Sequence, residues 1–253
     1  MLDIKGMSVL VTGGGSGIGS GTAGYFVERG ARVTICGRRP EKLQQVAADL
    51  GEDCHWITGD ITQAADRSRI MDAAIEHGRG LGLLVNNAGN MLRGPITELR
   101  EAEVLEVFHA NVVAAMMMTA LGVPHLERTG GAVIFLGSVH TRRAYPGAST
   151  YAASKGAVEV LARVLAAELG PKKIRVGCVL PGAVATEINV RAGLCTAEEL
   201  EARMRSIESS HVLGRIGTET EVAEAIAYLA CAEWTTGASL VVDGGLALGV
   251  SGY

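Results

Sequence analysis

Short apolar runs alternate with longer helical segments along the chain, and no other feature of the sequence limits the fold as strongly. The apolar runs are rich in Val, Ile and Leu, as strands buried in a parallel sheet are, and they occupy residues 7–11, 33–36, 54–57, 81–85, 132–136, 174–180 and 238–242. The segments predicted to be helical comprise one that ends near residue 29, followed by 40–50, 66–77, 98–121, 151–169, 197–210 and 219–230. Because the two kinds of segment alternate, we predict an α/β fold with a doubly wound, parallel seven-stranded sheet and helices on both faces.

The composition suits one sheet covered by closely packed helices. The chain has 253 residues, of which 48% are hydrophobic and only 4% aromatic, and it contains 34 glycines. The core should therefore consist mainly of Ala, Val, Leu and Ile. Length alone allows one large domain or two small ones, but the composition shows no linker-like break, so we expect a single domain over residues 1–253.

Charge, hydropathy and cysteine usage exclude several classes of partner. The formal net charge is −4, so no basic surface for nucleic acid is expected. No uncharged apolar run reaches the length of a membrane span, and the N-terminus lacks the features of a signal peptide. The five cysteines are scattered without a C-x-x-C pair, which indicates reduced thiols. We therefore expect a cytoplasmic protein with no metal site, no nucleic-acid partner and no membrane partner.

A glycine-rich turn separates the first predicted strand from its helix. Gly13, Gly17 and Gly19 stand in a G-x-x-x-G-x-G pattern, where a tight turn lets backbone N–H groups reach a pyrophosphate at the helix N-terminus. Gly21 and Gly24 lie farther along the helix, and we interpret them as allowing close helix–sheet packing. The turn by itself could be an ordinary glycine-rich connection, but its position favours a dinucleotide-binding loop.

Ser138, Tyr151 and Lys155 form a candidate catalytic set. Tyr151 and Lys155 stand four positions apart on a predicted helix, so their side chains share one face. An ammonium beside a phenol favours the phenolate and lowers its pKa from about 10, and such a phenol can transfer a proton near neutral pH. Ser138, at the end of a predicted strand, could hydrogen-bond the same substrate oxygen. A Y-x-x-x-K pattern alone is common and can be coincidental, so the assignment depends on the rest of the chain.

Polar residues follow two further strands, at the carboxyl edge where ligands bind in such sheets. Asp60 comes just after the third predicted strand. Its carboxylate could accept the adenine amino group of a dinucleotide, or it could cap the next helix. Asn86-Asn87-Ala88-Gly89 ends the fourth predicted strand, and asparagine side chains there can tie neighbouring strand ends together.

Together these motifs resemble the short-chain dehydrogenase/reductase family, in its single-domain branch. The matching positions are Thr12-Gly13-x-x-x-Gly17-Ile18-Gly19, Asn86-Asn87-Ala88-Gly89, Asn111, Ser138, Tyr151-x-x-x-Lys155, Pro181-Gly182 and Val242-Asp243-Gly244-Gly245. The resemblance covers nearly the whole chain. It implies a Rossmann-type fold, a nicotinamide cofactor, and hydride transfer between that cofactor and a secondary alcohol or ketone.

The resemblance also implies a role for each of four residues. Tyr151 would be the general acid/base, and Ser138 would orient the substrate oxygen. Lys155 would hold the nicotinamide ribose and depress the pKa of Tyr151, and Asn111 would keep a water in the proton relay. The cofactor would be bound by Gly13, Ser16, Gly17, Ile18, Gly19, Arg38, Arg39, Asp60, Ile61, Asn87, Ala88, Gly89, Tyr151, Lys155, Pro181, Gly182, Val184 and Thr186.

The end of the second predicted strand indicates which nicotinamide cofactor is preferred. Gly37 stands where an acidic residue would bind the ribose 2′-hydroxyl of NAD, and Arg38 follows where an arginine can accommodate the 2′-phosphate of NADP. Arg39 precedes a helix and is expected to face solvent. Both arginines could instead be simply exposed, and Ser16 stands in the glycine loop where a second basic residue could be. We predict NADP as the preferred cofactor, with NAD also accepted.

The substrate pocket implied by the resemblance lies beneath a lid at about residues 187–212. The residues expected to contact the substrate are His140, Met91, Tyr145 and Ala183. His140 could alternatively be a surface or capping residue. An apolar pocket is suggested by Met91, Leu92, Leu194 and Met204, although Met and Leu at helical spacing are more often simply core. The charged run 198–205 would be the solvated face of the lid.

Two other functions remain open. Within the enzyme class, the protein could reduce a carrier-bound 3-oxoacyl thioester, because Arg128 and the Lys172–Lys173 pair could dock an acidic carrier. Exposed basic residues at loop ends are, however, usually just solvated. In another class, the protein could bind a dinucleotide without catalysis. The intact catalytic set argues against that function, because a pure binding protein does not need it.

We expect the protein to assemble as a homotetramer. The family resemblance implies it, and the predicted helices 98–121 and 151–169 are rich in small residues. Their outer faces are expected to include Ala114, Ala115, Ala157 and Leu161. Closed symmetry would bury such faces against each other.

Overall fold

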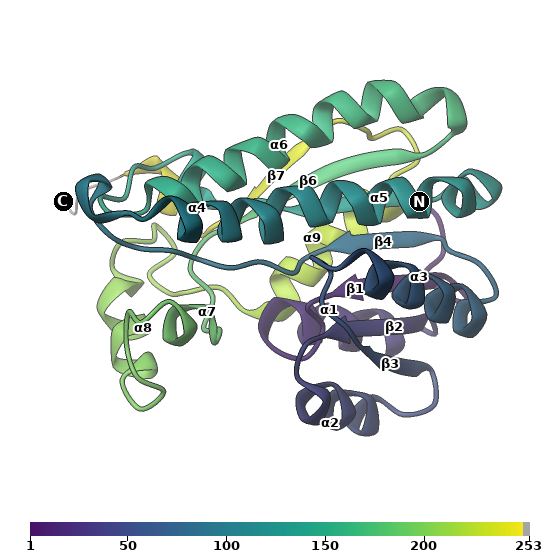
Figure 1. Ribbon diagram of the computed structural model, residues 1–253, viewed down its shortest axis with the longest axis horizontal. Helices are drawn as coiled ribbons and strands as arrows, with labels where there is room; N and C mark the ends of the chain where they lie inside the picture. The colour runs from purple at the N-terminus through teal and green to yellow at the C-terminus, as the bar shows by residue number, and fades with distance from the viewer. Residues whose placement is uncertain (250–253) are drawn as a thin grey trace.

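A computed structural model describes residues 1–249; residues 250–253 of the predicted domain lie outside the described part. Seven parallel strands form one sheet in the order β3-β2-β1-β4-β5-β6-β7, which confirms the predicted doubly wound fold (Figure 1). The strands are β1 (Ser8–Thr12), β2 (Arg32–Gly37), β3 (Cys54–Thr58), β4 (Leu83–Asn86), β5 (Ala132–Leu136), β6 (Arg175–Pro181) and β7 (Ser239–Val242). The strand order reverses between β1 and β4, and open α/β sheets bind ligands at such a switch point.

Helices cover both faces of the sheet. They are α1 (Gly17–Val27), α2 (Pro40–Leu50), α3 (Ala64–Gly78), α4 (Glu101–Phe108), α5 (Ala114–Thr129), α6 (Ser149–Leu169), α7 (Ile188–Arg191), α8 (Leu200–Glu208) and α9 (Glu219–Cys231). Short 3-10 turns are η1 (Ile96–Glu98), η3 (Val139–Thr141), η4 (Gly170–Lys172) and η5 (Leu246–Leu248), and η2 (His109–Val113) is a π turn. Residues of α1, α2 and α9 pack on one face of the sheet, and residues of α3, α5 and α6 pack on the other.

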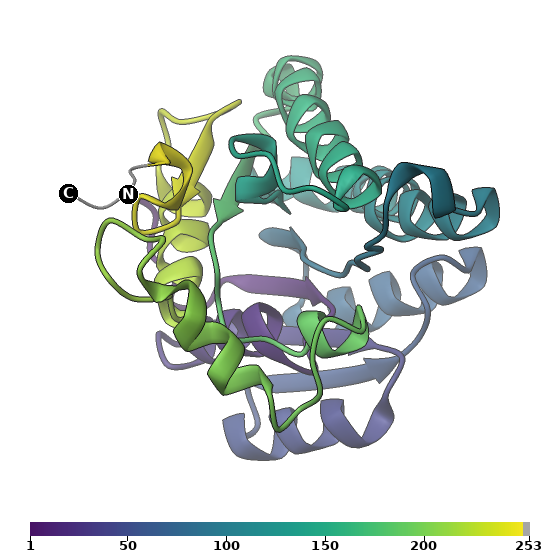
Figure 2. The same cartoon turned by 90° about the vertical axis from the view of Figure 1, so that its left-hand side faces the viewer.

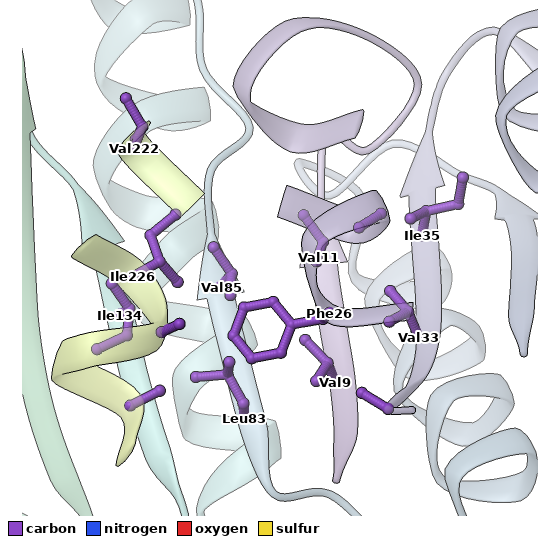
Figure 3. Packing of buried hydrophobic residues seen from close by; sticks show 14 of the residues in the cluster. Val9, Val11, Phe26, Val33, Ile35, Leu83, Val85, Ile134, Val222 and Ile226 are labelled. Atoms are coloured by element: carbon purple, nitrogen blue, oxygen red, sulfur yellow. The ribbon is translucent and has the colours of Figure 1, made fainter. Parts of the chain in front are cut away.

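Alternate strand residues supply the two halves of the core, as a sheet covered on both faces requires. In β1, Val9 and Val11 belong to the cluster under α1, whereas Leu10 belongs to the cluster on the opposite face. Phe26 of α1 is fully buried, and Figure 3 shows its ring lying beside Leu83. Burial of a Phe side chain stabilises the fold by about 1.5–3 kcal/mol. This contact holds α1, and with it the glycine-rich turn that precedes α1, against the sheet.

The long helix predicted at 98–121 differs from the observed one in its ends and in its middle. The helical run begins at Glu101, changes to a π turn at His109–Val113 and continues to Thr129. Pro124 does not end the run. It is exposed to solvent, so the carbonyl that loses its N–H partner at a helical proline can be hydrated there.

The expectation that no uncharged apolar run reaches the length of a membrane span is wrong for this helical run, which is the one helical stretch within residues 1–249 whose length and hydropathy would allow it to cross a membrane. Its apolar residues have another explanation. Ala114, Met118 and Leu126 are buried in the core cluster on the α5 face of the sheet, and Figure 1 shows α5 running alongside the strands. Packing against the sheet therefore accounts for the buried apolar residues of this helix, whereas Met116 and Met117 are exposed.

The chain between β6 and α9 crosses the carboxyl edge of the sheet; we call residues 182–217 the crossing segment. It contains α7 and α8, and Figures 1 and 2 show both helices beyond the ends of the strands. An isolated parallel bridge pairs Val184 with Gly217, so the two ends of the crossing segment are held together. The region predicted as a substrate lid, about 187–212, lies between these two residues.

Candidate functional site

A cleft of about 760 Å³ opens at the carboxyl edge of the sheet. It is lined by all but two of the residues predicted for catalysis, cofactor or substrate: Gly13, Ser16, Gly17, Ile18, Arg38, Arg39, Asp60, Ile61, Asn87, Ala88, Gly89, Met91, Ser138, His140, Tyr145, Tyr151, Lys155, Pro181, Gly182, Ala183, Val184 and Thr186. The two exceptions, Gly19 and Asn111, are buried behind its wall. One cleft therefore contains both the glycine-rich turn and the Tyr–Lys pair.

The glycine-rich turn requires glycine at positions that a side chain could not occupy. Gly13 and Gly17 have φ angles of +70° and +59°, which favour glycine. A Cβ atom on Gly19 would lie 2.2 Å from the Gly13 carbonyl oxygen, so glycine there allows α1 to begin close beneath the turn. Ser16 precedes α1 without capping it, and the first turn of α1 has no acidic residue. The N–H groups of this helix end are thus available to an anion, which fits the diphosphate of a dinucleotide.

Thr12 connects the glycine-rich turn to the end of β4. Its hydroxyl accepts hydrogen bonds from the backbone N–H groups of Asn87 (3.0 Å) and Ala88 (3.1 Å). The Asn87 side chain donates in return to the carbonyl groups of Thr12 (2.8 Å) and Gly13 (3.2 Å). As the sequence suggested, an asparagine ties two neighbouring strand ends together, and it does so at the floor of the cleft.

The ends of β5 and α6 place Ser138, Tyr151 and Lys155 together at the other end of the cleft. All three residues are buried. Lys155 Nζ donates a hydrogen bond to the Leu136 carbonyl at 2.7 Å and lies 5.7 Å from the centroid of the Tyr151 ring. The arrangement brings a hydroxyl, a phenol and an ammonium group to one part of a cleft that can admit a ligand.

Burial changes the acidity of this pair in a direction that the sequence did not predict. Desolvation raises the pKa of Tyr151 to about 12, although a hydrogen bond with Ser138 lowers it in part. Desolvation lowers the pKa of Lys155 to about 8, against the opposing charge of Cys178. The expected lowering of the Tyr151 pKa is therefore wrong for this structure, because removal of the phenolate from water is the largest cause of the shift.

Asn111 lies on the π turn between α4 and α5, a feature that often marks functional sites. Its Oδ1 accepts a hydrogen bond from the backbone N–H of Asn90 (2.7 Å), and its Nδ2 donates to the Asn90 carbonyl (2.9 Å) and to Ser154 Oγ (2.9 Å). A Cβ atom on Gly89 would lie 3.0 Å from Asn111 Oδ1 and 3.5 Å from Lys155 Nζ. Asn111 is thus close to Lys155, and its hydrogen bonds connect the segment after β4 to α6 behind the cleft.

His140 lies in the cleft, so of the two positions left open by the sequence the structure favours the one beside the substrate. Its Nδ1 is 3.0 Å from Ser138 Oγ. The imidazole ring packs against Tyr145 with 4.4 Å between centroids and meets Tyr151 edge-on at 5.1 Å. Burial, with the nearby charge of Arg93, lowers the pKa of His140 to about 4. A neutral imidazole therefore adjoins the Ser138 hydroxyl at neutral pH.

Of the two arginines after β2, only Arg39 differs from its expected position. Arg38 is exposed at the rim of the cleft. Arg39, expected to face solvent, donates hydrogen bonds to Ser16 Oγ (3.2 Å) and to Glu187 (2.7 Å), and Lys42 Nζ lies 3.3 Å from the same carboxylate. Burial alone would raise the pKa of Glu187, but the bonds and charges of Arg39 and Lys42 outweigh it and lower the pKa.

Asp60 does not cap the next helix, because the N-cap residue of α3 is Gln63; its contact with an adenine stays a prediction. Its Oδ1 accepts hydrogen bonds from the Thr62 backbone N–H (2.9 Å) and from the Thr62 hydroxyl (2.8 Å), so it stabilises the turn before α3. Asp60 also lines the cleft. The local bonds engage one carboxylate oxygen and leave the other for a ligand.

The substrate end of the cleft is less apolar than the sequence suggested. Met91, Leu194 and Met204 line it as expected, but Arg93 and Arg203 line it too. Sequence reasoning missed both arginines. Arg93 follows β4 within seven residues, which places it at the carboxyl edge and could have identified it. Arg203 belongs to the charged run that is expected to be solvated. Its helical spacing from Leu200 and Ile207 places it on the apolar face of α8 and could have identified it.

The fold and the cleft together define the class of protein. A doubly wound parallel sheet with an uncapped helix N-terminus behind a glycine-rich turn is a Rossmann-type fold. A family model described as short chain dehydrogenase matches residues 7–194, and the chain belongs to this family of oxidoreductases.

Alignments with individual relatives cover almost the whole chain. A glucose 1-dehydrogenase from Gluconobacter oxydans is 37% identical over 252 residues, covering 96% of this chain and 92% of that protein. A human 3-oxoacyl-[acyl-carrier-protein] reductase is 30% identical, covering 94% of this chain and 97% of that protein. The crystal structure of a 3-ketoacyl-(acyl-carrier-protein) reductase from Brucella melitensis complexed with NADH has a TM-score of 0.89 and 30% identity, covering 96% of this chain and 99% of that one.

Proposed function

We propose that the protein is a NAD(P)-dependent oxidoreductase that interconverts a secondary alcohol and a ketone. The observation that carries this proposal is the convergence of Ser138, Tyr151 and Lys155 in the same cleft as the glycine-rich turn. Membership of the short chain dehydrogenase family and the NADH-bound relative support a nicotinamide cofactor.

The residues of the cleft suggest how the reaction proceeds. A bound nicotinamide would supply or accept the hydride; the glycine-rich turn would hold its diphosphate and Lys155 its ribose. During reduction, the Tyr151 phenol donates a proton to the carbonyl oxygen of the substrate, while Ser138 donates a hydrogen bond to that oxygen. During oxidation, the Tyr151 oxygen takes the proton back. This step requires the phenolate, which burial disfavours and which a neighbouring ammonium favours.

After Tyr151 has given up its proton, Lys155 and Asn111 are assigned the role of supplying a new one. A pKa of about 8 allows Lys155 to exchange a proton near neutral pH. The π turn at Asn111 interrupts the regular helical hydrogen bonds beside Lys155, which supports a role for this turn in holding a water for the relay.

The preferred cofactor is proposed to be NADP(H), with NAD(H) also accepted. Gly37 brings no carboxylate to the end of β2, and the guanidinium groups of Arg38 and Arg39 line the cleft directly after it. Planar guanidinium groups suit a phosphate. A comparison of kcat/KM with both cofactors and one substrate tests the preference, and Gly37→Asp/Arg38→Leu should reverse it. A wild type that favours NAD(H), or a double variant with unchanged preference, would contradict the proposal.

A reductase of carrier-bound 3-oxoacyl chains is the second candidate, because two of the relatives carry that activity in their names. Two of the three basic residues suggested for docking the carrier form contacts within the chain. Lys172 Nζ lies 3.1 Å from a Glu127 carboxylate oxygen, and Arg128 donates to the Pro124 carbonyl at 3.1 Å. These contacts favour the small-molecule substrate.

A substrate screen that follows the absorbance of the reduced cofactor tests the proposed function. The panel contains neutral ketones, oxo acids, sugars and a carrier-bound 3-oxoacyl thioester, each with NADPH and NADH. Turnover of small ketones supports the first candidate, and turnover of the thioester alone supports the second. Tight cofactor binding without turnover of any member would identify a non-catalytic binding protein.

The protein is further proposed to be a cytoplasmic homotetramer, but not through two of the four residues predicted for its contacts. Ala114 and Ala115 were expected on an outer face and are buried in the core. The larger apolar side chains that are exposed on these helices include Val113, Met116, Met117 and Leu121 at α5 and Val160 and Val164 on α6. Adjacent exposed apolar side chains on two long helices support burial against another copy of the chain.

A further inference from the structure

We propose that the substrate carries an anionic group, a carboxylate or a phosphate, which Arg93 and Arg203 bind in the part of the cleft next to Tyr151. The inference rests on the proposed function, because it concerns the ketone or alcohol that reacts at Tyr151. Both arginines line the cleft. They come from different walls, since Arg93 follows β4 and Arg203 lies on α8 of the crossing segment.

Arg93 is near both the second arginine and the residues around Tyr151. Its Nη2 donates one hydrogen bond, to the Pro146 carbonyl at 3.3 Å, which leaves most of the five guanidinium donors free. Burial lowers the pKa of Arg93, and the charge of Arg203 lowers it further. Arg93 in turn contributes to the lowered pKa of His140, whose ring adjoins Tyr151. The positive charge of Arg93 therefore acts on His140, a group beside Tyr151.

Two buried donors in this region lack a partner within the described part of the chain. They are Arg203 Nε and the hydroxyl group of Tyr145, and both residues line the cleft. A buried donor without an acceptor destabilises the folded protein, so such groups are usually satisfied by a ligand or water. The oxygen atoms of an anionic ligand would supply acceptors for Arg93, Arg203 and Tyr145 together.

The carboxylates that line the cleft form no ion pair with Arg93 or Arg203 within residues 1–249. Among the described lining residues the carboxylates are Asp60 and Glu187. Asp60 Oδ1 is bound by Thr62, and Glu187 is bound by Arg39 and Lys42.

The two substrate-side arginines therefore have no compensating charge. Within residues 1–249 neither Arg93 nor Arg203 forms an ion pair. Like charges that are close in a partly buried cleft repel each other, and an anion between them would replace that repulsion by two attractions.

The chemistry of the guanidinium group identifies the substrate class. Its planar fork matches the oxygen atoms of carboxylates and phosphates. The substrate is therefore an oxo acid or hydroxy acid, or a ketone or alcohol that carries a phosphate. A neutral ketone or sugar would leave both positive charges without a counterion.

Matched substrates measure the contribution of the charge. The assay uses a series of short-chain oxo acids that differ in the spacing between ketone and carboxylate. Each acid is compared with its methyl ester and with the phosphonate of the same spacing. For the best spacing, we expect kcat/KM for the charged compound to exceed that for the ester by about 10–100-fold, as charge-assisted hydrogen bonds would give. The preference between carboxylate and phosphonate then distinguishes the two anions.

Arginine variants test whether these two side chains cause the preference. Arg93→Gln and Arg203→Gln should each raise KM for the acid about tenfold and raise it far less for the ester. Arg203→Lys keeps the charge and should retain part of the preference. The control is Arg205→Gln on the same helix, because Arg205 is exposed and pairs with Glu201 at 2.6 Å; it should leave the preference intact.

Calorimetric binding of the acids and esters to the protein with bound cofactor gives a second readout that does not need turnover. Equal affinity for acid and ester, or an acid preference that both Gln variants retain, would overturn the anionic subsite. If acids bind through the two arginines but no ketone is reduced, the subsite stands and the proposed function fails. If neutral ketones are reduced as well as the acids, the proposed function stands and the subsite is overturned.

Discussion

At the scale of single residues, Tyr151 is the side chain on which the proposed chemistry depends. Tyr151→Phe removes the proton donor and keeps the ring that packs beside His140. We expect kcat to fall by roughly 10²–10⁴-fold, the range for loss of general acid–base catalysis, while the cofactor Kd stays unchanged. Steady-state kinetics and a fluorescence titration with NADPH measure the two quantities. A Phe variant with more than about a tenth of the wild-type activity would show that Tyr151 is not the acid/base.

His140 should make the protein less stable in mild acid. The pKa of His140 is lowered from 6.5 to about 4, chiefly by burial. Between these two pH values the unfolded chain binds a proton that the folded protein excludes, so the free energy of unfolding should rise as pH rises from about 4 to about 6.5.

Urea denaturation at several pH values measures this effect, with His140→Asn as the comparison. The variant should show a flatter dependence than the wild type within that window. The assignment to His140 fails if the two proteins have parallel curves.

At the scale of elements, Glu187 joins the crossing segment to α2 and to the glycine-rich turn. Its carboxylate holds Arg39 and Lys42, the same groups that could meet the 2′-phosphate of NADP. We therefore predict that Glu187 competes with that phosphate. Glu187→Gln should lower KM for NADPH by about two- to fivefold, because partly exposed ion pairs contribute up to about 1 kcal/mol, and it should change KM for NADH less.

The matched control for this prediction is Glu201→Gln on α8. Glu201 also pairs with an arginine, Arg205, but it does not line the cleft. Equal changes in KM for NADPH and NADH would show that Glu187 acts on the crossing segment as a whole and does not compete for the phosphate.

At the scale of the whole molecule, the exposed apolar side chains of α5 and α6 are the expected contacts of the assembly. Met117 and Val164 are 39% and 56% exposed. Met117→Glu and Val164→Glu should shift the protein from tetramer to a smaller species, because burial of an unpaired carboxylate opposes association. Light scattering at micromolar concentration measures the mass.

Ala48→Glu provides the control, because Ala48 is exposed on α2, which covers the opposite face of the sheet. This variant should keep the mass of the wild type. A wild type that is monomeric would refute the proposed assembly outright.

Much of the architecture follows from local sequence patterns. The run at 132–136 has the predicted bounds of β5, and Pro40 begins α2 as predicted. The glycine-rich turn was also predictable, because positive φ at Gly13 and Gly17 is a property of those residues themselves. The π turn at His109–Val113 was not, since no spacing in the sequence marks it.

Local patterns in the sequence predict which segments are strands and helices, and which residue types gather at the carboxyl edge, because these properties depend on neighbours within a few positions. The electrostatics of the cleft, in contrast, depend on the packing of distant segments. Arg39 donates a hydrogen bond to Glu187, which is 148 positions away, and the charge of Arg203 lowers the pKa of Arg93. The acidity of Tyr151 depends on how much of the surrounding protein excludes water. Charge and desolvation act through space, so their balance is set when distant segments pack together.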